Sequence, residues 1–407
     1  MSSIIDYTIN IISNLASTRI AYIIHAPNID SVVAASLLAR VLITQGIEIN
    51  LAPSTEIIPN DIEGPILLIG LNPTKNLKGK KIFAITFSNE GRIRTQGNVV
   101  IIPSNGSSLS ILIAQALEEL YIVPTECKLL ALSAALERTE KSIFNRRFTE
   151  LEQMMINKLI ADNIISKIKT LKLFKYPTIA LNEAMYITID PFIPGISGND
   201  EGVSELIKNL GISEKVTELD LDKIAQEFAA KLSKSLRKLG ISKDEFITEK
   251  IIINKPNIIK DIYETYYSLS YGIDKYGLKA LLPVALSRIV LASILASYKE
   301  KFREIVDYIN VVIEGLVDME RYNIQGETIT VLSYADIEEP PPVAILARVL
   351  QSINFIKRER IVVNWKGKYC ISVQQLTNIY PLYLENIELR KGLVLSPTLT
   401  SIVKFMR

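Results

Sequence analysis

The sequence predicts an α/β fold whose N-terminal part is built on a parallel sheet. Apolar runs of strand length alternate with helical patterns over the first 140 residues. These runs are continuous rather than alternating with polar residues, which is typical of strands buried on both faces of a parallel sheet. The helical patterns between them are expected to cover both faces. The chain then becomes mostly helical, and it returns to an α/β pattern near its end.

Five strands are expected in the N-terminal sheet, at 20–26, 46–52, 64–72, 81–88 and 98–103. Three helices are expected with them, at 31–45, 107–121 and 125–141, and Ser107 or Ser108 suits the N-cap of the second. Ligands of parallel sheets bind at the carboxyl ends of the strands. In this chain those ends are the segments HAPNID, GLNP and TFSNEG.

The pattern divides the chain into four regions. We expect the parallel-sheet domain at 1–141, a linker helix and short strand at 142–186, a mostly helical segment with room for a partner-binding insertion at 187–325, and a smaller α/β domain at 326–407. The longest apolar stretch, 280–298, carries Pro283 and Arg288 near its middle. A charge at mid-membrane costs about 3 kcal/mol, so this stretch is expected to form a packed core helix rather than a membrane span.

Composition bears on the possible partners of the protein and on its cellular compartment. The formal net charge of +2 over 407 residues neither demands nor excludes nucleic acid as a partner. Cys127 and Cys370 lie far apart without the spacing of metal ligands, which fits a reducing cytoplasm. The first residues lack the cationic start of a signal peptide, so no membrane association is expected.

The strand ends do not supply the ligands of a hydrolytic metal site. Hydrolysis of phosphodiesters by two metal ions needs several carboxylate and imidazole ligands from different strand ends. The first strand end offers His25, the only histidine of the chain, and Asp30. The third offers Asn72 without an acid, and the fourth offers hydroxyl and amide side chains with Glu90 further on. A metal site of that kind cannot be assembled from these residues, and no cofactor is implied.

The layout nevertheless resembles the DHH phosphoesterase superfamily. That superfamily's first motif is a histidine followed by two spaced aspartates, a glycine and small residues that open a helix, and here His25, Ala34 and Ala35 match it. The other motif positions are occupied by Pro27 and Ile29 (the two aspartates), Asp30 (the glycine), Gly70 (the second aspartate), and Thr86, Phe87 and Ser88 (the Asp-His-His signature). The later aspartate of the family falls at or beside Glu137, the one place where an acid survives.

Two further stretches narrow the resemblance to archaeal RecJ-like proteins. The segment DPFIPGISGNDEG within 187–212 is similar to a run of fixed Pro and Gly positions in those proteins, followed by a helix. The segments 327–356 and 360–374 resemble the accessory domain that follows the DHH domain, with a strand, a rigid loop at 340–342, a helix and a strand pair. The glycine-rich loop with a histidine that ends this accessory domain is reduced to Gly392.

This resemblance implies a catalytically inactive member of a nuclease superfamily. Such proteins, including the cell-division-cycle forty-five branch, act in DNA replication, where they bind the GINS complex and the ring of the MCM helicase. We therefore expect a non-catalytic replication factor located in the cytoplasm at the nucleoid. Two other functions stay open: a repair factor that binds single-stranded DNA, and an unusual exonuclease or phosphoesterase. The lack of carboxylates at the strand ends argues against an enzyme.

Two basic clusters are candidate contact surfaces. The expected helix 222–241 carries cations at helical spacing, Lys231, Lys234, Arg237 and Lys238, which suit a solvated face or a surface that binds nucleic acid or a partner. A second cluster combines cations with an aromatic ring, and its candidate DNA or partner contacts are Lys357, Arg358, Arg360, Trp365, Lys366 and Lys368. That mixture suits weak stacking on single-stranded bases, and it equally suits an edge strand protected by lysines.

Overall fold

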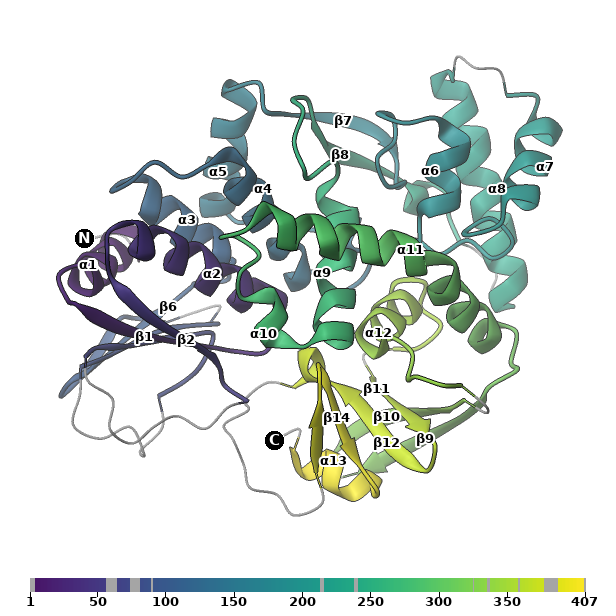
Figure 1. The fold of residues 1–407 in the computed structure, drawn as a ribbon. Helices are drawn as coiled ribbons and strands as arrows, with labels where there is room; N and C mark the ends of the chain where they lie inside the picture. Colours follow the sequence, from purple (N-terminus) through teal and green to yellow (C-terminus); the bar gives the residue numbers. More distant parts are fainter. Residues whose placement is uncertain are drawn as a thin grey trace.

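The structure is a computed structural model. It describes residues 4–55, 64–73, 81–88, 91–212, 216–237, 241–324, 326–334, 337–357, 359–376 and 387–405. Asn89, Glu90, Lys238 and Arg358 lie outside these described residues. The expected α/β architecture is confirmed: a parallel sheet near the N-terminus, helices in the middle and a second sheet near the C-terminus (Figure 1). None of the described helices combines the length and the apolar character needed to cross a membrane.

The N-terminal sheet has six strands in the order β2-β1-β3-β4-β6-β5. Its strands are β1 (Ile20–His25), β2 (Glu48–Pro53), β3 (Ile66–Ile69), β4 (Ile82–Thr86), β5 (Arg94–Gln96) and β6 (Val99–Pro103). Neighbouring strands run parallel except β5, which pairs antiparallel with β6. The five expected strands are therefore confirmed. The three-residue β5 was not expected, because its side chains are all exposed and polar.

Helices cover this sheet on one face. The helices α1 (Ile4–Ala16), α2 (Ile29–Thr44), α3 (Leu109–Glu118) and α4 (Thr125–Ala135) belong to the main core together with Ile23, Leu67 and Phe83 of the strands. The opposite face carries a separate small apolar cluster that includes Ile24 and Leu68. Figure 1 places the purple and blue helices on the same side of the strands. Among the described residues, the expectation of helices on both faces is therefore wrong.

The middle of the chain combines helices with one long-range strand pair. It contains η1 (Leu136–Arg138), η2 (Ile143–Asn145), α5 (Glu150–Ala161), β7 (Ile165–Leu171), α6 (Leu181–Ile187), α7 (Asp200–Leu210), α8 (Glu218–Leu236), η3 (Lys243–Phe246), β8 (Ile247–Ile253), α9 (Ile262–Tyr276), α10 (Leu278–Leu281) and α11 (Arg288–Ile313). The strands β7 and β8 pair antiparallel. The region is mostly helical as expected, whereas the domain boundaries themselves stay predictions.

The apolar stretch 280–298 is not one packed core helix. The helix α10 ends at Leu281, a turn follows around Pro283, and α11 begins with Ser287 as N-cap. Proline has no backbone N–H to continue a helix, which explains the break. Ile289 is 79% exposed at the start of α11, while Leu291 and Ile294 face the core. The expectation of a continuous buried helix is therefore wrong.

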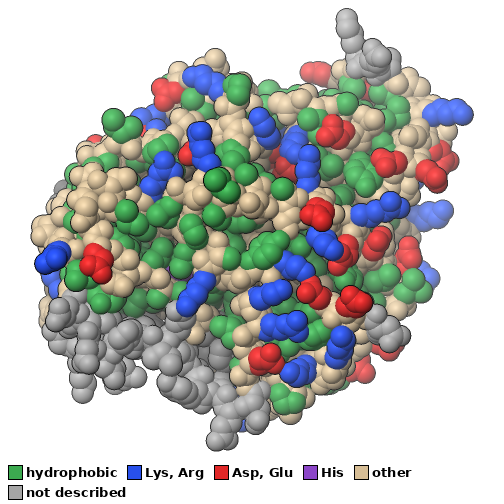
Figure 2. All heavy atoms as spheres, viewed as in Figure 1, with side chains coloured by type: hydrophobic (Ala, Val, Ile, Leu, Met, Phe, Trp, Pro, Cys, Tyr) green, Lys and Arg blue, Asp and Glu red, His purple; other side chains and the backbone are tan. Residues whose placement is uncertain are grey.

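The C-terminal sheet has the order β13-β14-β12-β11-β10-β9. Its elements are β9 (Asp318–Ile324), β10 (Glu327–Ser333), α12 (Val343–Ser352), β11 (Arg360–Trp365), β12 (Lys368–Ser372), η4 (Val373–Gln375), β13 (Glu388–Arg390), β14 (Leu393–Ser396) and α13 (Leu399–Phe405). The expected strand, proline loop, helix and strand pair of 327–374 are confirmed. On the face seen in Figure 2, Lys and Arg side chains alternate with acidic ones over this half of the molecule, and hydrophobic side chains gather over the N-terminal helices.

Candidate functional site

The predicted site residues gather at the carboxyl edge of the N-terminal sheet. His25 ends β1, Gly70 follows β3, and Thr86 ends β4. The parallel register pairs His25 with Ile69 and Ile69 with Ile85, so these three strand ends lie at one level. The residues at these three strand ends therefore share one edge of the sheet. The chemistry available at this edge depends on the packing and the hydrogen-bond partners of its side chains.

Gly70 leaves no room for a side chain. Its φ of +75° lies in the left-handed region, which glycine adopts at no steric cost. A Cβ atom built there would overlap with the Ser31 Oγ atom and would lie 2.8 Å from Cε2 of Phe87. Phe87 itself is 36% exposed, and the Arg138 guanidinium lies 4.9 Å from the centre of its ring. The space of a second-motif aspartate is thus filled by an aromatic ring and a hydroxyl.

The other replaced positions are also part of the packing. Pro27 and Ile29 are buried, and Ile29 is 1% exposed. Thr86 is buried at the end of β4, and the Ser88 carbonyl oxygen accepts a hydrogen bond from the Gly106 N–H at 2.7 Å. These positions serve the fold and present no carboxylate to solvent.

His25 is completely buried. Its Nδ1 donates to the Ala26 carbonyl oxygen at 2.8 Å, and its Nε2 has no hydrogen-bond partner among the described residues. Burial lowers the pKa of the imidazole from 6.5 to about 4, against the opposing effect of the bond to Ala26. The side chain is therefore neutral at physiological pH and acts as a core residue.

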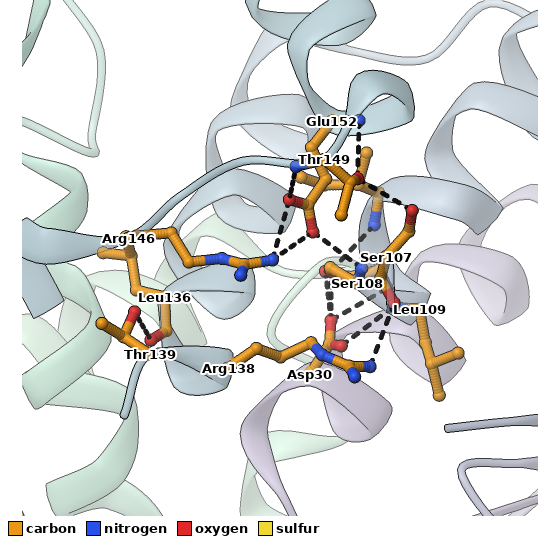
Figure 3. A network of polar contacts seen from close by, with 12 residues as sticks. Asp30, Ser107, Ser108, Leu109, Leu136, Arg138, Thr139, Arg146, Thr149 and Glu152 are labelled. Carbon is orange, nitrogen blue, oxygen red and sulfur yellow. Dashed lines mark hydrogen bonds and ion pairs between the residues drawn. The ribbon is translucent and has the colours of Figure 1, made fainter. Parts of the chain in front are cut away.

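Asp30 holds the first turn of α3. Its carboxylate is fully buried and accepts hydrogen bonds from the Ser108 and Ser110 hydroxyls, both at 2.6 Å. It also accepts from the backbone N–H of Leu109 at 2.8 Å and of Ser110 at 2.9 Å (Figure 3). A carboxylate at a helix N-terminus neutralises unpaired N–H groups and favours the helix dipole. The acceptor capacity of Asp30 is thus used for structure rather than for a metal ion.

Glu137, the surviving acid, caps α2. Its carboxylate accepts from the backbone N–H of Ile29 at 3.2 Å and of Asp30 at 2.8 Å. Burial raises the pKa of Glu137 to about 7, and the neighbouring Asp30 charge acts in the same direction, while the two backbone bonds oppose them. Glu137 therefore acts as a cap for the N-terminus of α2.

A third carboxylate, Glu152, was missed by the sequence reasoning. It is fully buried, and Arg146 donates to both of its oxygens, at 2.6 and 2.7 Å (Figure 3). It also accepts from the backbone N–H of Ser108 at 2.8 Å and of Thr149 at 2.8 Å, forming a capping box with Thr149. The Thr-x-x-Glu spacing is a sequence signal for such a box. The contact to Ser108 has no sequence signal, because it joins residues far apart in the chain.

The described residues of this site therefore organise helices and offer no ligand set for metal chemistry. Asp30, Glu137 and Glu152 each accept backbone N–H groups at the start of a helix. Within the described ranges, no group of three or more His, Cys, Asp and Glu side chains is placed to hold a metal ion. None of the residues that the structure describes at this edge fits the two-metal mechanism.

The second basic cluster lies inside the C-terminal sheet. Strands β11 and β12 are interior strands, so the alternative of an edge strand protected by lysines is wrong. Trp365 is 7% exposed, its Nε1 donates to the Ile337 carbonyl oxygen, and Lys366 and Arg390 lie about 5 Å from its ring. Lys368 pairs with Glu388 at 2.8 Å.

Two further cations of this cluster, Arg360 and Lys357, lie at or near the protein surface. Arg360 pairs with Glu327 at 3.4 Å, and Lys357 is exposed. Contacts of this cluster with DNA stay a prediction.

The accessory-domain loop at Gly392 approaches the protein's own backbone. A Cβ atom at this position would overlap with the carbonyl oxygen of Ile273 in α9. Only glycine permits such an approach. The glycine of this loop therefore packs against a helix, where the resemblance would place substrate.

Comparisons with known proteins show which fold and which family this chain resembles. The crystal structure of CDC45 from Entamoeba histolytica is similar over 99% of this chain and 98% of that chain, with 12% identity and a TM-score of 0.60, so the two share a fold. Structures of RecJ with Mn²⁺ from Thermus thermophilus and of exonuclease RecJ bound to manganese match with TM-scores of 0.43 and 0.40 and identities of 10% and 11%. They match over 99% of this chain and over 53% and 92% of those chains. No curated protein matches the chain. The family model described as archaeal Cdc45 matches residues 71–376, which is most of the chain, and the protein therefore belongs to the archaeal Cdc45 family.

Proposed function

We propose that the protein is a non-catalytic DNA replication factor that binds the GINS complex and supports the MCM replicative helicase. Membership of the archaeal Cdc45 family supports a role in replication. The observation that carries the non-catalytic part is the closed position at Gly70, where Phe87 and Ser31 occupy the space of a metal-binding side chain. Binding is the function that remains for a fold of this size. Since MCM acts on DNA, we expect the protein at the nucleoid.

Single-stranded DNA is a secondary partner in this proposal. Lys357, Lys366 and Lys368 supply cations without a continuous aromatic stacking surface, because Trp365 is buried. Binding to phosphates through cations weakens with salt, by a slope of about −0.7 per neutralised phosphate on single strands. Weak, salt-sensitive binding is expected. Tight binding that ignores salt would favour the repair-factor function instead.

Two experiments test the proposal separately. The purified protein is incubated with end-labelled single-stranded DNA and Mn²⁺, and we expect no degradation. Processive digestion that a Pro27→Trp variant abolishes would refute the non-catalytic assignment. Affinity purification of the tagged protein from its native cells, followed by mass spectrometry, is expected to recover GINS at a stoichiometric level. Recovery of repair proteins without GINS would refute the helicase assignment.

A further inference from the structure

A large groove separates α8 from the end of α11 and the start of β9. Its volume is about 780 Å³. One wall comes from the C-terminal end of α8, and the other comes from Asn310 to Gly315, from Met319 of β9 and from Phe355. These elements lie at one side of the molecule, where the helical middle region meets the C-terminal sheet (Figure 1). The groove shares none of its lining residues with the edge of the N-terminal sheet.

The α8 wall is basic. Lys231 and Lys234 are spaced three residues apart, which places them along one side of the helix end, and Arg237 is the C-cap residue that follows. Lys234 and Arg237 are exposed, and none of the three cations forms an ion pair with a described residue. Glu314 is the one carboxylate among the described residues that line the groove. The groove therefore carries an excess of positive charge that the described protein does not neutralise.

Apart from Asn310 and Glu314, the facing wall is apolar. It is formed by Val312, Ile313, Val317, Met319 and Phe355. Met319 is 42% exposed, and Leu316, three residues earlier in the chain, is 71% exposed. The strand β9 is an edge of its sheet, paired only with β10 among the described strands. An exposed apolar surface beside a free strand edge is typical of a binding site for a peptide segment.

We propose that this groove binds an acidic segment, with interspersed apolar side chains, from a protein partner of the replication complex. Its carboxylates would pair with Lys231, Lys234 and Arg237, and its apolar side chains would lie against Met319 and Phe355. This charge complementarity selects an anionic occupant. Nucleic acid fits less well, because single strands need stacking surfaces and Phe355 is the only aromatic side chain among the described lining residues. The inference rests on the proposed function and names the surface that it uses.

The test compares a charge-reversal variant with a matched control. The variant combines Lys231→Glu and Lys234→Glu in the groove wall. The control combines Lys208→Glu and Lys404→Glu, two exposed lysines outside the groove lining. A separate variant, Met319→Glu, changes the apolar wall at an exposed side chain and carries little folding cost. Thermal unfolding of each full-length protein verifies that the variants are folded.

Dissociation constants are measured by isothermal titration for purified cognate GINS and for MCM. We expect the groove variant and Met319→Glu each to weaken binding of at least one of these probes by about tenfold. The control is expected to match the wild type within about twofold. The loss at the charged wall should shrink as salt rises, because salt screens interactions between exposed charges.

The outcomes separate this inference from the proposed function. If the wild type binds GINS or MCM and all variants bind equally well, the groove assignment is wrong and the proposed function stands. If the groove variant loses affinity for a single-stranded oligonucleotide while protein binding is unchanged, the groove is a nucleic-acid surface and the inference is overturned. If the wild type binds neither protein, both proposals fall.

Discussion

The ring of Phe87 lies where a side chain at Gly70 would extend, 2.8 Å from the position of its Cβ atom. The two residues follow neighbouring strands, β3 and β4, whose carboxyl ends would carry metal ligands in an active phosphoesterase of this type. An aromatic ring in that space excludes both a carboxylate and the ion that it would hold. The packing around Gly70 therefore leaves no room for a metal-binding side chain at this position.

Gly70→Asp is expected to destabilise the protein without restoring metal binding. The residue would be strained at φ +75° and would overlap with Ser31 and Phe87, at a combined cost of about 3 kcal/mol. Chemical denaturation measures this free energy. Gly97→Asp is the matched control, because Gly97 has φ +60° and nothing within 4 Å of an added Cβ. Equal stability of the two variants would show that the space at Gly70 is not filled.

Asp30→Ala is expected to destabilise the fold by about 3 kcal/mol or more, because it removes the acceptor of four hydrogen bonds to the first turn of α3. Binding of GINS should be retained at temperatures where the variant is folded. Asp200→Ala serves as control, since that carboxylate is an exposed first-turn residue of α7 and is worth about 0.5 kcal/mol. A stable Asp30→Ala protein that has lost only its affinity for Mn²⁺ would instead identify Asp30 as a ligand.

His25 is expected to stay neutral well below pH 6.5. The imidazole has a pKa of about 4 in the folded protein and about 6.5 in the unfolded chain. Between these two pH values the unfolded chain is protonated and the folded chain is not. Stability is therefore lost as pH falls from about 6.5 to about 4, by about 3 kcal/mol from this residue. As the chain has one histidine, ¹⁵N-detected NMR of the imidazole follows this titration alone. Protonation of the folded protein near pH 6.5 would contradict the burial of the ring.

Introducing the two missing aspartates, Pro27→Asp with Ile29→Asp, is not expected to create a nuclease. The ligands at Gly70, Thr86, Phe87 and Ser88 would still be absent, and a charge at the buried Ile29 position would destabilise α2. The measurement is digestion of labelled single-stranded DNA with Mn²⁺, with Ile29→Asn as a control for the burial of a polar group. Time-dependent digestion by the double variant alone would mean that the site has been misplaced.

The sequence was sufficient for the parts of the fold that follow from local pattern. The continuous apolar runs of β1, β3 and β4 predicted a parallel sheet, which the pairing of these strands confirms. The strand β8 was missed because Lys250 interrupts its apolar run. That lysine is fully buried, and its Nζ lies 2.9 Å from the Asp261 carboxylate, a partner that no local pattern reveals.

The use of the site residues depended on contacts between distant parts of the chain. Asp30 was identified as a degenerate motif position, but its partners Ser108 and Ser110 lie about 80 residues further on. Glu152 also accepts a hydrogen bond at the start of α3, from the backbone N–H of Ser108. Sequence position gave the location of Asp30 only, and the packing of α2, α3 and α5 showed that both carboxylates act as helix caps.

Size-exclusion chromatography of the purified protein mixed with cognate GINS tests the central claim most directly. We predict one peak of defined stoichiometry, verified by light scattering, that survives about 0.3 M salt, because contacts that depend on charge alone weaken at that ionic strength. Each component is also run alone, and circular dichroism verifies that both are folded. Two separate peaks from well-folded samples at micromolar concentration would contradict the assignment as a helicase factor.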